Sequence, residues 1–195
     1  MFKDKIALKV TLLLASMMTM MAGAVMAPSL PQINEHFMAI PNADMLTRLI
    51  ITLPALFIAF LAPVAGWFID KFGRKQILVY SLVLYGFAGT SGFFLNNMFS
   101  ILVSRALLGM AVAGIMTTAV TLIGDYFEGD ERNTFMGLQA AFMGFGGVVF
   151  IAMAGLFADI RWNYPFLIYG FSFLVLILVI FFFFFQIHIP CIFLA

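Results

Sequence analysis

Long stretches without charge dominate the chain, and short charged clusters separate them. No Asp, Glu, Lys or Arg lies between Lys9 and Glu35, or between Arg48 and Asp70. Three further uncharged stretches follow, and no such charge occurs after Arg161. A helix needs about 20 apolar residues to cross the hydrocarbon of a bilayer, and its backbone must satisfy its own polar groups there. The pattern therefore predicts membrane-spanning helices.

Two polar residues divide the longest apolar region into two helices. The region from Gln76 to Gly124 is too long for one span, and Asn96 and Asn97 supply a turn between two apolar runs. The pattern therefore predicts an all-α integral membrane protein with six transmembrane helices. These spans are expected at about residues 7–30, 47–69, 76–95, 98–123, 134–158 and 164–185.

The composition supports membrane insertion and narrows the functional classes. Apolar residues make up 64% of the 195 residues and charged residues 10%, against roughly 45–50% and about 25% in soluble domains. A net charge of +1 gives no indication of a nucleic-acid partner, and the single cysteine, Cys191, excludes a disulfide framework. The chain has neither an HExxH motif nor an acid–histidine cluster. We therefore expect no enzyme, no cofactor and no metal site.

Lysine and arginine lie mostly on one side of the expected membrane. With the N-terminus inside, seven of these residues fall on the inner side and two on the outer side, and basic residues favour the cytoplasmic side. We therefore expect both termini in the cytoplasm, and the lack of Asn-x-Ser/Thr sequons fits a bacterial inner membrane. The inner residues are Lys3, Lys5, Lys9, Lys71, Arg74, Lys75 and Arg132, and the outer residues are Arg48 and Arg161.

The loop between the second and third spans is very short and carries a distinctive set of residues. It contains Gly66, Asp70, Gly73, Arg74 and Lys75 in the arrangement Gly-x-x-x-Asp-x-x-Gly-Arg-Lys. Gly73 permits a turn that a side chain would oppose, and Gly66 allows another helix to approach closely. Asp70 ends a span, where it can pair with a basic group or face the N-terminus of a helix. An ordinary basic inner loop accounts for the Lys and Arg residues but not for this arrangement.

This arrangement resembles the signature loop of the major facilitator superfamily (MFS) of secondary transporters. The resemblance extends over nearly the whole chain, to about residue 185. It implies a six-helix N-terminal half of a twelve-helix fold, built as a 3+3 inverted repeat, with the substrate site between two halves. It also implies that the loop is a gate during alternating access. Transport would then need the missing C-terminal half or a second copy of the chain.

A short internal echo agrees with an inverted repeat. The pattern Gly-x-Phe-x-Asp closes the second span at residues 66–70 and the fifth span at residues 155–159. The first copy is expected on the inner side and the second on the outer side, about three spans later. Two three-helix units of opposite orientation have this relation.

Arg105 is a charged residue within the expected fourth span. It lies about seven residues, or roughly 10 Å, below the outer surface, where a charge is costly and marks a functional candidate. A side chain that snorkels outward to lipid headgroups is the alternative. Arg105 and Gly109 resemble the fourth-span motif of the family, which implies that the arginine faces the cavity and takes part in proton coupling.

Asp125 ends the fourth span on the inner side. Twenty residues of helix place it about 30 Å from Arg105, so these two side chains cannot pair, whereas the hairpin at residues 70–75 lies on the same face. The family resemblance implies a charge network between Asp125 and Arg74 that stabilises the outward-facing state and breaks when the transporter opens inward. A solvated carboxylate at the helix end is the alternative.

These features favour a proton-coupled transporter of a small solute, with the lipid bilayer and that solute as partners. Arg105 and five methionines in the first span favour efflux over uptake, because methionine adapts to varied ligands, although ordinary apolar filling also explains the methionines. Gly146-Gly147 is followed by Val148, so the proline of the family's antiporter motif is lacking. The alternatives are nutrient uptake by the same fold and a truncated, non-transporting membrane protein.

The end of the chain departs from the expected pattern. Five consecutive phenylalanines occupy residues 181–185, and residues 186–195 contain no Lys or Arg, although an inner loop is usually basic. We interpret this tail as an out-of-frame reading of a truncated transporter gene. A separately encoded half-transporter, a dimer of halves and a fragment of a longer chain are the alternatives.

Overall fold

Helices account for all regular structure in the part of the chain that the structure describes. The computed structural model describes residues 2–186, with side chains for residues 8–181, so the tail expected at residues 186–195 lies, beyond Gln186, outside the described residues. The elements are α1 (Phe2–Ala24), η1 (Ala27–Ser29), α2 (Leu30–His36), α3 (Ala43–Phe72), α4 (Arg74–Ser91), α5 (Met98–Tyr126), α6 (Gly129–Ile160), η2 (Tyr164–Gly170) and α7 (Phe171–Gln186).

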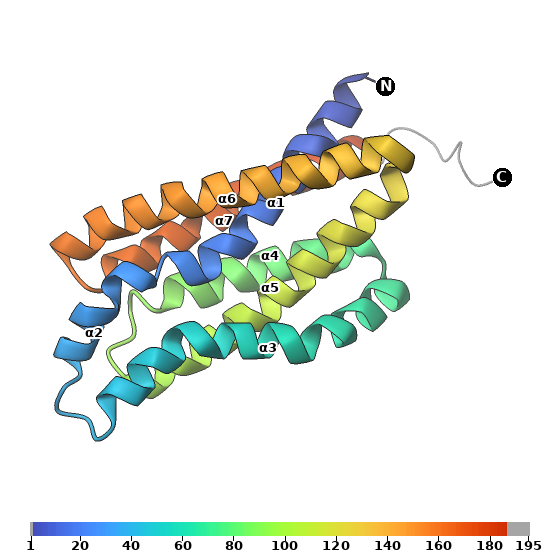
Figure 1. Cartoon of the computed structure of the whole chain (residues 1–195). Coiled ribbons are helices and arrows are strands. Elements are labelled where there is room, and N and C mark those ends of the chain that lie inside the picture. Colours follow the sequence, from blue (N-terminus) through green and yellow to red (C-terminus); the bar gives the residue numbers. More distant parts are fainter. Residues whose placement is uncertain (1, 187–195) are drawn as a thin grey trace.

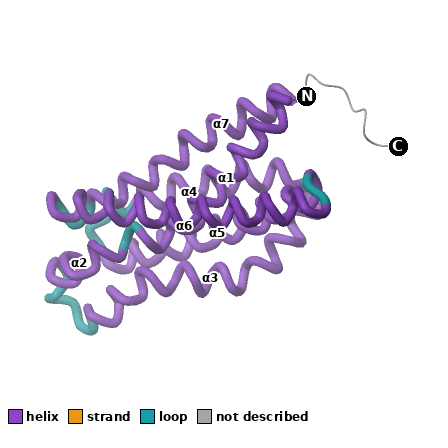
Figure 2. Tube along the Cα trace, turned by 45° about the horizontal axis from the view of Figure 1, so that its top comes forward, coloured by secondary structure: helices purple, strands orange, loops and turns teal. Residues whose placement is uncertain are grey.

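The helices run back and forth along a single bundle (Figure 1). Successive long helices reverse direction, and the connecting loops gather at the two ends of the bundle (Figure 2). The beginning of α1, the α3–α4 hairpin and the end of α7 therefore lie at the same end. α3 packs along α5, and α6 packs along α1, while α4 contacts α5, η2 and α7.

Five helical segments are long and apolar enough to cross a membrane, so the chain is an all-helical multi-pass membrane protein. They are Leu8–His36, Ala43–Phe72, Met98–Tyr126, Gly129–Ile160 and Tyr164–Phe181. The helix that corresponds to the expected third span, α4, has 18 residues and begins with Arg74, Lys75 and Gln76. Its apolar part is therefore shorter, and the expected count of six spans depends on this helix.

Burial differs sharply between the central and the outer helices. The most apolar stretch is 61% buried in the first span and in α5, but only 11% in α3 and 17% in α6. Large apolar side chains such as Phe60 of α3 and Phe145 of α6 are exposed. Faces of this kind need lipid or another polypeptide to cover them.

The first span is interrupted, whereas the sequence pattern predicts one helix over residues 7–30. α1 ends at Ala24, and a 3-10 turn and a short helix continue the chain to His36. Pro28 and Pro31 lack the N–H groups that would continue the helical hydrogen bonds. A discontinuous first span results.

Two other expected spans begin differently in the structure. The fifth span is expected from residue 134, but α6 begins at Gly129, with Asp130 and Glu131 in its first turn. Negative side chains are favoured there by the helix dipole, so these exposed acidic residues belong to the first turn of the helix. The sixth span begins as the 3-10 helix η2 and becomes α-helical only at Phe171.

Candidate functional site

A single glycine joins α3 to α4. Gly73 has a φ of +90°, a backbone conformation that favours glycine over residues with a side chain. Its N–H donates to the carbonyl of Ile69 at 2.9 Å and ends α3, and α4 starts at the next residue, Arg74. The turn therefore places the basic first residues of α4 directly beside the end of α3.

The structure brings Arg74 and Asp125 together at this end of the bundle. The Nε atom of Arg74 lies 2.6 Å from Oδ2 of Asp125, and Nη2 donates to Oδ1 at 3.2 Å. The two side chains are 44% and 38% exposed. This two-pronged geometry matches the planar guanidinium to the carboxylate and ties the hairpin to the end of α5.

Gly66, Asp70 and Lys71 of the hairpin lie on the outside of this bundle. Asp70 is exposed and has no hydrogen bond or ion pair within the described part of the chain. A Cβ atom placed on Gly66 would meet no atom within 4 Å. Lys71 lies with its Nζ atom 4.9 Å from the ring centroid of Trp67. Gly66 and Asp70 are thus available to a surface outside the described chain.

A second ion pair at the same end was not anticipated from the sequence. Lys9 of α1 and Glu131 of α6 are 3.0 Å apart, and Lys9 Nζ also lies 5.1 Å from the ring centroid of Phe127. The two partners are separated by 122 positions in the chain. Only their opposite charge and their position on the expected inner side could have indicated the contact.

Arg105 neither faces a cavity nor snorkels to the surface in this conformation. It is fully buried, at 0% exposure, and its Nη2 donates to the carbonyl of Gly89 at 3.2 Å. The rings of Phe166 and Tyr169 lie against its guanidinium. In this conformation Arg105 therefore lies inside the bundle and not at the expected cavity position.

Gly109 lies where α3 and α5 approach each other closely. A Cβ atom on Gly109 would lie 2.6 Å from the carbonyl oxygen of Pro54 and 2.8 Å from its Cα atom. Both are backbone atoms, which cannot move aside as a side chain can. Gly109 thus has a packing role between the two helices.

A largely apolar cavity between α1, α5 and α6 that holds a few polar side chains was missed from the sequence. Nε2 of Gln139 donates to Oγ of Ser16 at 2.6 Å, and both residues are buried. The cavity measures about 220 Å³, and its lining includes Ser16, Thr19, Gln139, Met116, Met136 and Met143. Buried polar side chains within spans are functional candidates.

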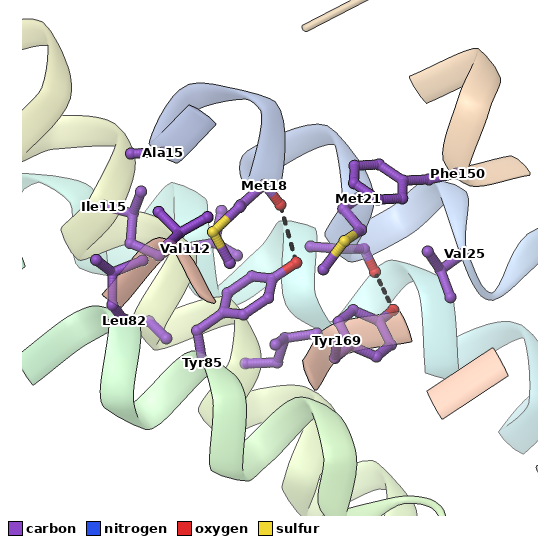
Figure 3. Packing of buried hydrophobic residues seen from close by; sticks show 14 of the residues in the cluster. Ala15, Met18, Met21, Val25, Leu82, Tyr85, Val112, Ile115, Phe150 and Tyr169 are labelled. Carbon is purple, nitrogen blue, oxygen red and sulfur yellow. Dashed lines mark hydrogen bonds between the residues drawn. The ribbon is translucent and has the colours of Figure 1, made fainter. Parts of the chain in front are cut away.

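The methionines of the first span divide between the core and the surface. Met18, Met21 and Met26 are fully buried in the apolar core, as Figure 3 shows for the first two. Met20 is 48% exposed. These three buried methionines fill apolar space inside the bundle and do not line the cavity beside Gln139.

The fold and the charged hairpin together define a multi-pass membrane protein of the transporter class. The family model of the Major Facilitator Superfamily matches residues 12–190, and the chain belongs to this family. The D-xylose-proton symporter shares its fold, with a TM-score of 0.79 and 16% identity over 90% of this chain and 47% of the symporter chain.

Three curated relatives are transporters of different solutes. The multidrug transporter protein MdtP of Bacillus subtilis is 27% identical over 80% of this chain and 28% of its own length. The bacillibactin exporter of B. subtilis is 29% identical over 75% of this chain and 37% of its own length. The niacin transporter NiaP of Acinetobacter baylyi is 32% identical over 54% of this chain and 24% of its own length. The chain thus spans well under half of the length of these relatives.

Proposed function

We propose that the protein acts in secondary transport of a small solute by alternating access, with proton coupling. The Arg74–Asp125 ion pair carries this proposal, because it joins the α3–α4 hairpin to the end of α5 across a single-residue turn. Exposed pairs of this kind are weak, with typical values of about 0.2–1 kcal/mol. A weak pair can open and close during a cycle, as a gate requires.

The proposed architecture is a 3+3 inverted repeat of six spans with both termini in the cytoplasm. The packing supports it, because α3 lies along α5 as α6 lies along α1. The first unit would consist of α1, α3 and α4, and the second of α5, α6 and α7. In such a repeat α1 corresponds to α5 and α3 to α6, so the α3–α5 pair corresponds to the α6–α1 pair. The basic residues Lys9, Arg74 and Lys75 lie at one end of the bundle, which suits the inner face of a bacterial membrane.

We infer that transport needs a second six-helix unit, either a C-terminal half or another copy of this chain. The exposed apolar faces of α3 and α6 support this inference. Asp70 and Gly66 lie outside the packing of the described helices. In the closed state they would meet the second unit, so that the hairpin gates the inner side.

Efflux of an amphipathic solute is the preferred direction, and uptake is the second candidate. The bacillibactin exporter supports efflux by its name, whereas the names of MdtP and of the niacin transporter state no direction. The cavity beside Gln139 suits either direction, because it combines three polar side chains with soft methionine walls. The remaining alternative is a membrane protein that transports no solute.

Proton flux in reconstituted vesicles tests the proposal. The chain is inserted into vesicles with a pH gradient, and an internal pH dye reports proton movement when niacin or puromycin is added. We expect solute-dependent proton flux that Asp70→Asn abolishes. Asp130→Asn is the matched control, because it removes an exposed carboxylate at the same end of the bundle. Absence of flux with either solute in correctly inserted protein that has formed a dimer would rule out transport by two copies of this chain. It would leave a requirement for a C-terminal half and the non-transporting alternative.

A further inference from the structure

Arg105 is a buried cation with an unusual set of partners. Its side chain is fully inaccessible, and one hydrogen bond, from Nη2 to the carbonyl of Gly89, is found. The Nε and Nη1 atoms have no hydrogen-bond partner within the described chain. No carboxylate forms an ion pair with it there. A buried charge without a counter-charge is strongly destabilised unless other groups stabilise it.

Two aromatic rings occupy the place where a carboxylate would be expected. The guanidinium carbon lies 4.8 Å from the ring centroid of Phe166 and 4.9 Å from that of Tyr169. Both distances are within the roughly 6 Å over which the negative face of a ring attracts a cation. This attraction is strongest away from water, and Phe166, Tyr169 and Arg105 are all fully buried.

A row of glycines on α4 and at its C-terminal cap lets these rings come close enough. Cβ atoms on Gly92, Gly89 and Gly86 would overlap the side chains of Phe166, Tyr169 and Ser172, respectively. The two rows run antiparallel, and each has a spacing of three residues. In a 3-10 helix, which has three residues per turn, side chains three apart lie in line. The 3-10 form of η2 therefore aligns Phe166 and Tyr169 along the glycine row.

Tyr169 is also fixed from the opposite side. Its hydroxyl donates to the carbonyl of Ala22 at 2.9 Å, and Tyr85 makes the same kind of bond to Met18, as the dashed lines in Figure 3 show. The N–H of Met26 bonds to Gly23, so the interruption of the first span leaves the Ala22 carbonyl free for Tyr169. The ring is thus held between α4 and the end of α1.

We propose that Phe166 and Tyr169 are positioning residues for Arg105, and that their ring faces replace a counter-carboxylate. The Gly86–Gly89–Gly92 row and the 3-10 form of η2 set the ring positions, and the Gly89 carbonyl fixes one edge of the guanidinium. The device keeps a positive charge inside the half without an acidic partner. A role of this arrangement in proton coupling rests on the proposed function. The contact of Arg105 with the two rings does not depend on it.

Stepwise fluorination of Phe166 tests this proposal. Fluorine weakens the negative face of the ring with little change in shape, so phenylalanines with one, two and three fluorine atoms are introduced at position 166. We expect the apparent unfolding temperature of the chain in detergent to fall by about 1 °C with each fluorine. In an Arg105→Met background this stepwise fall is expected to vanish, because no cation faces the ring.

A matched series at Phe157 controls for fluorine itself, because this residue packs against the core without a cation on its ring. Absence of a stepwise fall at position 166, or an equal fall in the Arg105→Met background, would overturn the proposal. The series requires no transported solute. Lack of flux in vesicles would therefore count against the proposed transport function alone. The dependence on fluorine would still test whether the ring of Phe166 stabilises the Arg105 guanidinium.

Discussion

At the scale of single residues, glycines decide where helices can meet. Gly109 lies against the backbone of Pro54, and Gly89 and Gly92 lie against aromatic rings of η2. Gly66, in contrast, faces open space although it belongs to the family motif. The same residue type thus serves packing inside the bundle at some positions and leaves a surface free at others.

Replacement of Gly109 by alanine is expected to destabilise the bundle. The new Cβ atom would lie 2.6 Å from the Pro54 carbonyl oxygen, so α3 and α5 must separate, at a typical overpacking cost of about 1–3 kcal/mol. Gly137→Ala is the control, because no atom lies within 4 Å of its added Cβ. There, helix propensity favours alanine by roughly 0.5–1 kcal/mol. Unfolding in detergent measures both, and equal effects at the two positions would contradict the packing role.

The Arg74–Asp125 pair is expected to show a small coupling that depends on salt. A double-mutant cycle with Arg74→Gln and Asp125→Asn should give about 0.2–1 kcal/mol, as for other exposed pairs. Because both side chains are more than one-third exposed, the coupling should fall in about 1 M salt, where the Debye length is about 3 Å. A coupling that is unaffected by salt would argue against a solvent-accessible gate.

The sequence indicates local chemistry better than distant partners. The hairpin could be predicted because Gly73, Arg74 and Lys75 are adjacent, and Asp125 could be related to them because span counting places it at the same end. The aromatic partners of Arg105 lie about 60 positions later in the chain, and only the packing of η2 reveals them. Periodicity likewise predicts helices but not the 3-10 form, which depends on tertiary contacts.

At the scale of elements, α4 is the helix whose membrane position most needs a test. It has 18 residues, and at 1.5 Å per residue it extends about 27 Å, close to the hydrocarbon thickness. It packs along α5, which does qualify as a span. Its polar first turn belongs to the α3–α4 hairpin, so its apolar stretch is short.

Cysteine labelling from the two sides of the membrane is expected to show that α4 crosses it. In a Cys191→Ser background, Lys75→Cys should react with an impermeant maleimide only from the cytoplasmic side and Asn96→Cys only from the outer side. Lys75 lies in the first turn of α4, and Asn96 lies in the loop between α4 and α5. Arg161→Cys, after α6, is the control for outer labelling. Labelling of both test positions from one side would reduce the spans to the five that hydropathy identifies.

At the scale of the whole molecule, we expect the faces of α3 and α6 to meet another protein unit and the surface of α4 to meet lipid. The α3 and α6 faces carry exposed apolar residues, and the α3 face also carries the uncovered residues Gly66 and Asp70. The surface of α4 beside α7 also exposes a large side chain, Phe87, but it carries no part of the hairpin motif. We therefore assign the α3 and α6 faces to a second unit and the α4 surface to lipid.

Cross-linking of the chain expressed alone is expected to follow this assignment. In a Cys191→Ser background, Gly66→Cys should react with a flexible bis-maleimide and give a species of about twice the 21.6 kDa mass of the chain. Phe87→Cys is the control, because its side chain is 64% exposed on α4 and its ring lies against Phe173 of α7, away from α3. It should stay monomeric, since lipid and not protein surrounds it. Cross-linking through Phe87→Cys but not through Gly66→Cys would show that the wrong face had been assigned to the second unit. The gating role of the hairpin would then lose its physical basis, because Asp70 would have no protein surface to meet.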